Sequence, residues 1–456
     1  MDTNTITEII ILAAGQGKRM RSKLPKVLHC IAGKPMLGHV IDSAKELDVA
    51  KVHVVVGHGA DLVKKEFDDP AICWATQAEQ LGTGHAVAQA MPSVDPNSIV
   101  LIAYGDVPLV KPSTMASLIE SADEDTLSLL TVFLDDPSNY GRIVRESGKI
   151  CAIVEEKDAN EEQRTIQEIN TGILAVTAEK LQEWLPRLSS DNAQKEYYLT
   201  EIIAMAVKDG MKVIAQHPDS VMEVEGANDR LQIAALERSY QQQQALRLMM
   251  EGATLADPDR FDVRGNVTVG EDVFIDVNCV FIGEVSIADD VTIGPNCIIE
   301  NSCIGQGTVI KSHCVLENAS VAENCDIGPF ARLRPGSVLA NKVKVGNFVE
   351  VKNTVLGEGS KANHLAYLGD SVLGSFCNIG AGTITCNYDG ANKYKTTLGN
   401  NVFIGSNSTL VAPINIGDDG FVGAGSTVTK NIPSNQLAIG RGKQRNIAGW
   451  KKPVKS

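Results

Sequence analysis

The chain is poor in aromatic residues, in paired cysteines and in long hydrophobic runs. Phe, Trp and Tyr together make up 5% of its 456 residues. None of the ten cysteines forms a CxxC pair, so the spacing typical of a zinc ribbon or a thioredoxin-like site is missing. The run "IIILAA" near the N-terminus is far too short for a membrane span or a signal sequence, and no basic leader precedes it. We therefore expect a cytoplasmic protein.

Positive charge is also scarce. The sequence has 42 basic and 56 acidic residues, which gives a formal net charge of −14. Nonspecific binding to nucleic acid or to an anionic membrane needs a basic face, so we expect no nucleic-acid partner and no membrane partner. Any phosphate ligand must then meet a local cationic pocket.

From Ile9 to about Val224 the sequence alternates short aliphatic runs with amphipathic segments. The runs are "EIIILAAG", "VHVVVGHG", "SIVLIAYGD", "LSLLTVFLDD" and "TGILAVT". Continuous apolar strands separated by helices are typical of a Rossmann-like α/β domain, whose mostly parallel sheet is covered on both faces. Ligands of such sheets bind at the carboxyl ends of the strands.

Glycine is plentiful, at 40 residues, and it accompanies a repeat that begins near Val267. A period of six predicts a parallel β-helix whose coils point one apolar residue in six inward. We expect cysteines such as Cys297 and Cys303 to be small buried residues of these coils. The apolar residues at six-residue intervals fall in five runs: Val269, Ile275, Phe281, Ile287 and Ile293; Ile304 and Ile310; Val321, Ile327 and Leu333; Val345 and Val351; and Leu398, Ile404, Leu410, Ile416, Val422 and Val428.

Between these regions, residues 230–252 lack proline and place apolar residues at helical spacing. This pattern predicts one helix that stops at Gly252. We expect three parts: a domain at 1–230, a linker helix at 231–251 and a repeat domain at 252–456.

The segment "LAAGQGKRMRSKLPKVL" (12–28) runs from a strand into two glycines and then into Lys18, Arg19, Lys23 and Lys26. Glycines let backbone N–H groups approach phosphate oxygens, and the cations neutralise them. Composition alone leaves two interpretations open, a phosphate site or an ordinary turn between strand and helix. Asp106, at the end of "IVLIAYGD", is likewise either a turn cap or a metal ligand.

That segment belongs to a set of motifs with "QLGTGHA" (80–86), "YGDVPL" (104–109), "YGRI" (140–143), "EINTG" (168–172) and "EVEGANDR" (223–230). The set resembles the sugar-phosphate nucleotidyltransferases. Joined to a hexapeptide-repeat domain, it resembles the bacterial bifunctional family of N-acetylglucosamine-1-phosphate uridylyltransferase and glucosamine-1-phosphate N-acetyltransferase. The resemblance covers nearly the whole chain and implies a left-handed β-helix in the C-terminal part.

The resemblance implies that the chain makes UDP-N-acetylglucosamine, a precursor of peptidoglycan and of the lipid A of lipopolysaccharide. The expected substrates are UTP, N-acetylglucosamine 1-phosphate, glucosamine 1-phosphate and acetyl-CoA. The expected assembly is a homotrimer.

In the uridylyl site, the resemblance implies that Lys26 contacts phosphate and that Asp106 and Asn228 bind Mg²⁺. Such an ion prefers oxygen ligands and keeps several waters, so one carboxylate and one amide oxygen suffice beside the substrate phosphates. The other substrate contacts implied are those of Leu12, Ala13, Ala14, Gly15, Gln77, Gly82, Thr83, Tyr104 and Gly105, with Gly141, Glu155 and Asn170 for the sugar.

The repeat is interrupted in "KANHLAYLGDSVLGSFCNIGAGTITCNYDGANKYKTTLG" (361–399), beside His364 and again at 386–395. Breaking the period costs hydrogen bonds between coils, so an insertion of this kind indicates binding. Histidine suits general-base catalysis because its pKa lies near neutral.

For the acetyl site, the resemblance implies that His364 deprotonates the amine of glucosamine 1-phosphate. Arg334 and Lys352 would bind the phosphate of that sugar, and Tyr367 and Asn378 would hold its ring. Acetyl-CoA would contact Ala381, Asn387, Tyr388, Ser406, Ala424 and Arg441.

Two other features leave alternatives open. The basic tail carries Arg441, Lys443, Arg445, Lys451, Lys452 and Lys455, and it is either simply solvated or attracts the phosphates of CoA. The chain as a whole could be a single-activity nucleotidyltransferase whose β-helix only assembles the oligomer, or a non-enzymatic scaffold.

Overall fold

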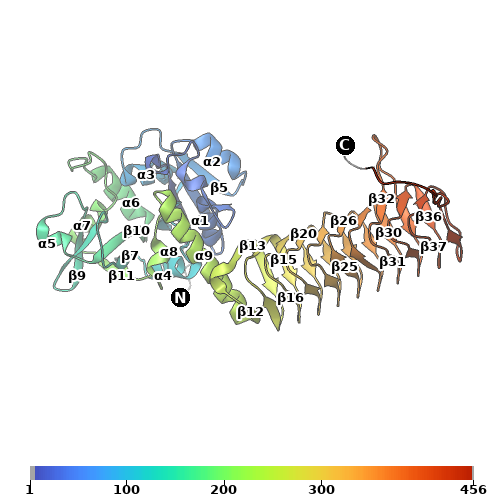
Figure 1. Ribbon diagram of the computed structural model, residues 1–456. Coiled ribbons are helices and arrows are strands. Elements are labelled where there is room, and N and C mark those ends of the chain that lie inside the picture. The colour runs from blue at the N-terminus through green and yellow to red at the C-terminus, as the bar shows by residue number, and fades with distance from the viewer. Residues whose placement is uncertain (1–5, 454–456) are drawn as a thin grey trace. The chain divides into compact units, whose positions relative to one another are not determined.

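The computed structural model describes residues 6–453. It contains two compact units, residues 1–240 and 241–456 (Figure 1). Over residues 6–453, none of the helices combines the length and the apolar character that a membrane crossing requires.

The first unit is built on a sheet with the strand order β11-β7-β10-β6-β1-β4-β5. Neighbouring strands are parallel except around β10, which runs antiparallel to both β6 and β7. The expected mostly parallel sheet is therefore confirmed. In that order the strands are β11 (Lys212–Gln216), β7 (Thr126–Phe133), β10 (Glu168–Thr177), β6 (Ile99–Tyr104), β1 (Thr7–Ala13), β4 (Lys51–Val56) and β5 (Ile72–Thr76).

Four shorter strands complete the first unit. β8 (Arg142–Glu146) and β9 (Lys149–Val154) form an antiparallel hairpin, which joins β10 at the pair Ile169 and Arg142. β2 (Cys30–Ile31) and β3 (Lys34–Pro35) form a separate ribbon.

Helices cover both faces of this sheet. Side chains along β1 alternate between two cores, with Ile9 and Ile11 in one and Ile10 and Leu12 in the other. The continuous apolar run of β1 follows from this burial on both sides. The first core is closed by α1 (Met36–Lys45), α2 (Ala60–Glu66) and α4 (Pro112–Glu120), and the second by α3 (Thr83–Ala90), α6 (Ala178–Trp184) and α7 (Glu201–Lys208). The short helices α5 (Glu161–Arg164) and α8 (Val221–Val224) lie in the connections.

The helix predicted at 230–252 is present as α9 (Arg230–Glu251). Its Leu236 packs in a small core of the first unit, whereas Ala245 and Leu248 pack in the core of the second. The fully buried side-chain amide of Gln241 donates to the carbonyl of Val263 at 2.8 Å and accepts from its N–H at 2.7 Å. Through these two bonds the amide pairs with Val263 in the first coil as the backbone of a neighbouring strand would.

The second unit is the β-helix expected from the six-residue period. Its strands form two sheets in residues 241–453, an 11-stranded short sheet and a 17-stranded long sheet, and every strand pair within them is parallel. The short sheet contains β12 (Ala253–Leu255), β14 (Val273–Ile275), β16 (Thr292–Ile293), β19 (Val309–Ile310), β22 (Asp326–Ile327), β25 (Lys344–Asn347), β28 (Lys361–His364), β31 (Asn378–Ile379), β34 (Phe403–Ile404), β37 (Phe421–Val422) and β39 (Leu437–Ala438).

The long sheet wraps the remaining sides of the coils. It contains β13 (Phe261–Val269), β15 (Cys279–Ile287), β17 (Ile298–Glu300), β18 (Cys303–Ile304), β20 (Val315–Glu317), β21 (Ser320–Val321), β23 (Arg332–Leu333), β24 (Val338–Leu339), β26 (Glu350–Lys352), β27 (Val355–Leu356), β29 (Tyr367–Gly369), β30 (Ser371–Leu373), β32 (Ile384–Cys386), β33 (Thr396–Leu398), β35 (Thr409–Val411), β36 (Ile414–Ile416) and β38 (Thr427–Val428).

The residues at six-residue intervals form the interior of the β-helix. All of them are buried except Val269, which packs against the core and is only partly covered. Cys297 is buried as expected, but the expectation for Cys303 was wrong. Cys303 and Ile304 form one short strand, and because side chains alternate along a strand, Ile304 points inward and Cys303 is exposed.

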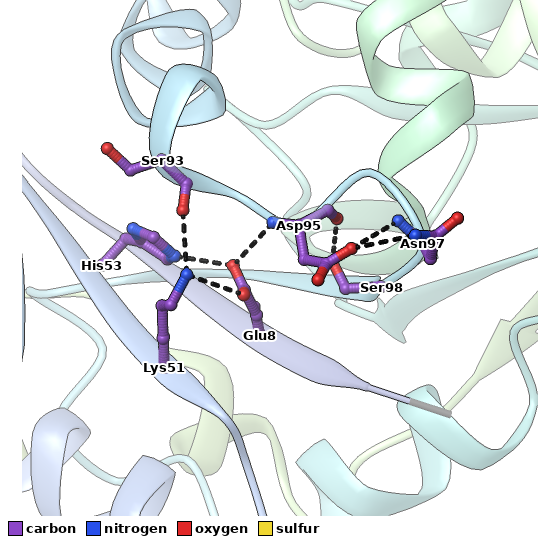
Figure 2. A network of polar contacts seen from close by, with 7 residues as sticks. All are labelled: Glu8, Lys51, His53, Ser93, Asp95, Asn97 and Ser98. Atoms are coloured by element: carbon purple, nitrogen blue, oxygen red, sulfur yellow. Dashed lines mark hydrogen bonds and ion pairs between the residues drawn. The ribbon is translucent and has the colours of Figure 1, made fainter. Parts of the chain in front are cut away.

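A buried polar network holds the sheet of the first unit at the N-terminal ends of β1 and β4 (Figure 2). The side chains of Glu8 and His53 are each 1% exposed, and Oε2 of Glu8 lies 2.8 Å from Nε2 of His53. Oε1 of Glu8 lies 3.5 Å from Nζ of Lys51, and the N–H of Asp95 donates to Oε2 at 3.4 Å. One carboxylate thus joins two strands to the turn before β6.

Replacement of this carboxylate should destabilise the first unit. In Glu8→Ala, His53 and the N–H of Asp95 lose their acceptor inside the protein, so the free energy of unfolding should fall by about 3 kcal/mol. Urea unfolding followed by the fluorescence of Trp74 and Trp184, which both lie in the first unit, measures the change. Asn97→Ala, at an exposed position of the same network, is the matched control and should change the free energy by less than about 0.5 kcal/mol. Equal effects of the two substitutions would contradict this assignment.

Candidate functional sites

A pocket of about 690 Å³ opens in the first unit at the carboxyl ends of β1 and β6. This is the edge at which ligands of parallel sheets bind. Most of the residues predicted for the uridylyl site line the pocket, namely Leu12, Ala13, Ala14, Gly15, Lys26, Gln77, Gly82, Thr83, Tyr104, Asp106 and Asn228.

The pocket receives its positive charge from the segment that follows β1. Lys18 and Arg19, in a 3-10 turn, and Lys26, in the next one, all line it. Lys23, the other cation predicted for this site, is not among the lining residues. In a chain with a net charge of −14, this clustering creates the local cationic surface that a phosphate ligand requires.

The N-terminus of α3 forms another wall of the pocket. Gly82 precedes the helix with φ 114, and a Cβ there would lie 2.6 Å from the carbonyl oxygen of Tyr197, so glycine is required. The side-chain amide of Gln77 donates to the carbonyl of Gly82 at 3.0 Å, and the hydroxyl of Thr83 accepts from the N–H of Leu199 at 3.1 Å. These bonds fix the turn that presents the first N–H groups of α3.

Asp106 and Asn228 aim their oxygens at one position. The ammonium of Lys26 lies there, paired with Oδ2 of Asp106 and 3.3 Å from Oδ1 of Asn228. Two oxygen donors that converge on a cation fit Mg²⁺. Across residues 6–453 no cluster of three or more His, Cys, Asp or Glu side chains is placed to hold a metal ion. Further ligands would therefore be water and substrate phosphates.

The residues predicted to hold the sugar form a group of their own. The N–H of Asn170 donates to the carbonyl of Gly141 at 2.8 Å, and a Cβ at Gly141 would lie 3.4 Å from both carboxylate oxygens of Glu155. Burial raises the pKa of Glu155, and a hydrogen bond from the Thr200 hydroxyl at 3.1 Å partly opposes that rise. None of the three is among the pocket-lining residues.

Tyr104 connects this group to the pocket. Its ring lies against Gly172, where a Cβ would come within 2.5 Å of it. Burial, together with the negative charges of Glu155 and Asp106, raises the pKa of Tyr104, so its hydroxyl stays protonated. Gly105, the next residue, packs against β1 instead, with its N–H bonded to the carbonyl of Leu12 at 2.9 Å.

Sequence reasoning missed three polar residues of the pocket. Gln16 and Gln80 lie inside the quoted motifs and could have been included. Glu196 has no local signal, because hydrogen bonds between residues distant in sequence hold its segment at the pocket, such as that from the N–H of Tyr197 to the carbonyl of Leu81 at 2.8 Å.

In the second unit, Arg334 and Lys352 lie on neighbouring coils, and the N–H of Arg334 donates to the carbonyl of Val351 at 2.8 Å. Nη1 of Arg334 also donates to Oε1 of Glu350 at 2.8 Å. Lys393, which the sequence reasoning missed, lies close enough that its charge, followed by that of Arg334, lowers the pKa of Lys352. The three cations form a group suited to a phosphate.

His364 is the last residue of β28, at the edge of the short sheet where its strands end, and its side chain is exposed. At this edge the coils are joined by backbone bonds such as that from the N–H of Asn407 to the carbonyl of Ala381, 2.7 Å long. Nη1 of Arg441 donates to the carbonyl of Ala424 at 2.6 Å. The register of these coils stacks four predicted residues in one column, in the order His364, Ala381, Ser406 and Ala424.

The second interruption of the repeat folds as a small hairpin. Tyr388 pairs with Lys393, and the N–H of Tyr394 donates to the carbonyl of Asn387 at 2.8 Å. The carboxylate of Asp389 closes the turn by accepting from the N–H groups of the loop at 2.8 and 2.7 Å. Asn387 is buried at the base of the hairpin, whereas Tyr388 is 60% exposed.

Tyr367 and Asn378 belong to different sheets. Tyr367 begins β29 of the long sheet and pairs with Glu350 beside the cationic group. Asn378 begins β31 of the short sheet, between Lys361 and Phe403. One copy of the chain therefore distributes the predicted acetyl-site residues over two sides of the β-helix.

Family comparisons agree with this architecture. A profile described as a MobA-like NTP transferase domain matches residues 9–191. Profiles described as the GMPPB C-terminal domain and as a hexapeptide repeat of succinyl-transferase match residues 263–353 and 395–430. A solved nucleotidyl transferase from Methanothermobacter aligns with 52% of this chain and 98% of its own, at 19% identity and a TM-score of 0.39.

Curated relatives match the chain over nearly its full length. Proteins named bifunctional protein GlmU from Marinobacter nauticus and Stutzerimonas stutzeri are each 58% identical to it over 449 residues, which is 98% of this chain and 99% of each relative. The protein of the same name from Acinetobacter baumannii is 57% identical over the same shares. The chain therefore belongs to the GlmU family of bifunctional proteins.

Proposed function

We propose that this chain makes UDP-N-acetylglucosamine in two steps, acetyl transfer in the second unit and uridylyl transfer in the first. The observation that carries the proposal is the full-length 58% identity to bifunctional relatives, and the pocket lined by most of the predicted uridylyl-site residues supports it. A single-activity nucleotidyltransferase or a scaffold would not need the column that contains His364. The product would supply precursors of peptidoglycan and lipid A.

In uridylyl transfer, a phosphate oxygen of N-acetylglucosamine 1-phosphate attacks the α-phosphorus of UTP, and pyrophosphate leaves. Such transfers depend on positioning and on charge compensation, and they need no protein nucleophile. The N–H groups of Gly15 and of the first turn of α3 would hold UTP, while Lys18, Arg19 and Lys26 offset its charge. Glu155, which lies beside Gly141 and whose charge reaches Tyr104, would contact the sugar.

Asp106 and Asn228 would hold Mg²⁺ in this site. When bound, the ion neutralises phosphate charge and helps to orient the phosphates. In its presence the ammonium of Lys26 would be free to move from these oxygens to a phosphate of UTP. Such an exchange of cations would explain why a lysine and two oxygen ligands share one position.

Asp106→Ala should abolish uridylyl transfer and leave acetyl transfer intact. The loss of the carboxylate should lower the rate of pyrophosphate release at least about 100-fold, because the phosphate charges lose their counter-ion. Pyrophosphate and CoA release, measured on the same full-length preparation, report the two reactions, and acetyl transfer is the internal control for folding. An unchanged dependence of uridylyl transfer on Mg²⁺ would overturn the assignment.

In acetyl transfer, the amine nitrogen of glucosamine 1-phosphate attacks the thioester carbonyl of acetyl-CoA, and the CoA thiolate leaves. An ammonium has no free electron pair, so a base must first remove a proton, and exposed His364 is suited to accept it. Arg334, Lys352 and Lys393 would bind the sugar phosphate, with Tyr367 beside them.

The column below His364 gives acetyl-CoA a track along the short sheet. The small side chains of Ala381, Ser406 and Ala424 leave room beside the sheet, and Arg441 follows at the far end. We propose that the basic residues Lys443, Arg445, Lys451 and Lys452, all exposed, attract the phosphates of CoA. Lys455, the last cation of the predicted tail, lies outside the described residues.

His364→Ala should lower acetyl transfer by about 100-fold or more, because the general base is lost, and should leave uridylyl transfer unchanged. His313→Ala is the matched control, since His313 is the other histidine of the repeat region and stacks on Phe330 with ring centroids 4.7 Å apart. CoA release with acetyl-CoA and glucosamine 1-phosphate measures the effect. A similar loss in both variants would indicate a structural role for His364.

We further propose that the chain is a homotrimer in the cytoplasm. The division of Tyr367 and Asn378 between two sheets supports sites that are completed by a neighbouring copy. All ten cysteines are free, as is usual in a reducing compartment.

Sedimentation should give about three times the chain mass of 48.8 kDa. Co-expression of His364→Ala with Lys352→Ala chains should restore acetyl transfer that neither variant has alone. If one copy supplies the histidine and its neighbour the lysine, about a quarter of the sites (one half times one half) are intact. The absence of any recovery in confirmed mixed trimers would show that each chain completes its own site.

A further inference from the structure

One corner of the β-helix carries short polar residues in the left-handed backbone conformation. Asn353 and Asp370 occupy this corner on successive coils, with φ 45 and 47, and the N–H of Asp370 donates to the carbonyl of Lys352 at 3.0 Å. Asn301 and Asn318 occupy it on earlier coils, with φ 43 and 46. Asn and Asp tolerate this conformation better than other side chains. The aspartate stands on the coil that precedes the hairpin 387–395.

Asp370 binds both ends of that hairpin. Oδ2 of its carboxylate accepts from the side-chain amide of Asn387 at the first end. Its backbone carbonyl accepts from the N–H of Thr396 at 3.2 Å, just past the last end. Oδ1 accepts from the side-chain amide of Asn353 at 2.5 Å, and the side chains of Asp370 and Asn387 are buried. The carboxylate is thus tied to the corner below and to the hairpin above.

Asp370 has a hydrogen-bonding capacity that the asparagines at this corner of the earlier coils lack. A carboxylate only accepts hydrogen bonds and has two oxygens, so it can receive two amide donors at once. Asparagine in its place would turn an NH₂ group against one of those donors. Burial alone would raise the pKa of Asp370, but the hydrogen bonds from Asn353 and Asn387, with the charges of Lys393 and Lys352, lower it, so the group is ionised.

The hairpin brings Lys393 to the cationic group and exposes Tyr388. We propose that Asp370 is a positioning residue for acetyl transfer: its carboxylate holds Asn387, and through it the hairpin 387–395, in the conformation that binds acetyl-CoA and the sugar phosphate. This inference rests on the proposed acetyl transfer, but the holding of the hairpin is a property that can be measured without it.

Asp370→Asn in the full-length chain tests the proposal, because it keeps the size of the side chain and removes one acceptor. If the ligand must order the hairpin as it binds, the free-energy cost of that ordering weakens binding of the ground state and of the transition state by the same amount. The KM for acetyl-CoA should therefore rise about tenfold while kcat stays within about twofold. A lowered kcat at unchanged KM, in a preparation whose folded fraction is unchanged, would overturn the proposal.

Hydrogen exchange of the backbone amides in 387–395 gives a second, activity-independent measurement. These amides, above all that of Tyr394, should exchange about ten times faster in Asp370→Asn than in the unmodified chain. Asn318→Asp, at the same corner on an earlier coil, is the matched control and should change neither exchange nor KM. Unchanged exchange in Asp370→Asn would overturn the inference. If exchange is faster in Asp370→Asn but the unmodified chain shows no acetyl transfer, only the proposed function is overturned.

If Asp370→Asn does not fold, Asn353→Ala serves as the second variant. It removes one of the two donors that hold the carboxylate and leaves the bond to Asn387 possible. Exchange in 387–395 and the KM for acetyl-CoA should rise in the same direction by about threefold. No change in either quantity would overturn the proposal.

Discussion

The second unit depends on the backbone hydrogen bonds that join each coil to the next. They fix the register, so residues 17 or 18 positions apart along the chain become neighbours in space, as Asn347 and His364 do. The apolar residues at six-residue intervals then stack inside, and whatever stands beside them stacks outside. The column from His364 to Ala424 exists because this register is kept on either side of the hairpin. The pair Arg334 and Lys352 exists because the same register holds on the coils before the hairpin.

The first unit reaches a similar precision by different means. Its strands are apolar on both faces, so the helices that cover them leave only the strand ends for polar chemistry. At the carboxyl ends, Lys26, Asp106 and Asn228 share one position. At the opposite ends, Glu8 and His53 form the buried pair. The sheet therefore positions these polar groups at its ends, and its apolar interior takes no part in their chemistry.

The sequence allowed much of this to be predicted. Hydrophobic period alone identifies both folds, because a buried parallel strand and a six-residue coil have different and unmistakable patterns. The glycine-rich segment after β1 left a phosphate site and an ordinary turn as alternatives, and the pocket lies at this segment with Lys18, Arg19 and Lys26 in its lining.

What could not be predicted depends on contacts between distant residues. Hydrogen bonds such as the backbone bond between Tyr197 and Leu81 hold the segment of Glu196 at the pocket, and Lys393 reaches Lys352 because a hairpin of particular shape carries it there. Cys303 was misassigned because the expectation overlooked its place directly before the inward-facing Ile304, where the alternation of side chains along the strand turns it outward. No local sequence pattern distinguishes Asp370, because its proposed role depends on the hydrogen bonds that it accepts from Asn353 and Asn387.

The uneven distribution of chemistry along the β-helix has one more consequence. The coils from β13 through β22 contribute none of the residues proposed for acetyl transfer, which begin at Arg334. Each coil contacts only its neighbours and adds about 4.8 Å, so these early coils act as a spacer whose length can change in whole coils while the chemistry stays the same. Evolution could then set the distance between helix α9 and the acetyl site by duplication or deletion of one coil, without rebuilding either.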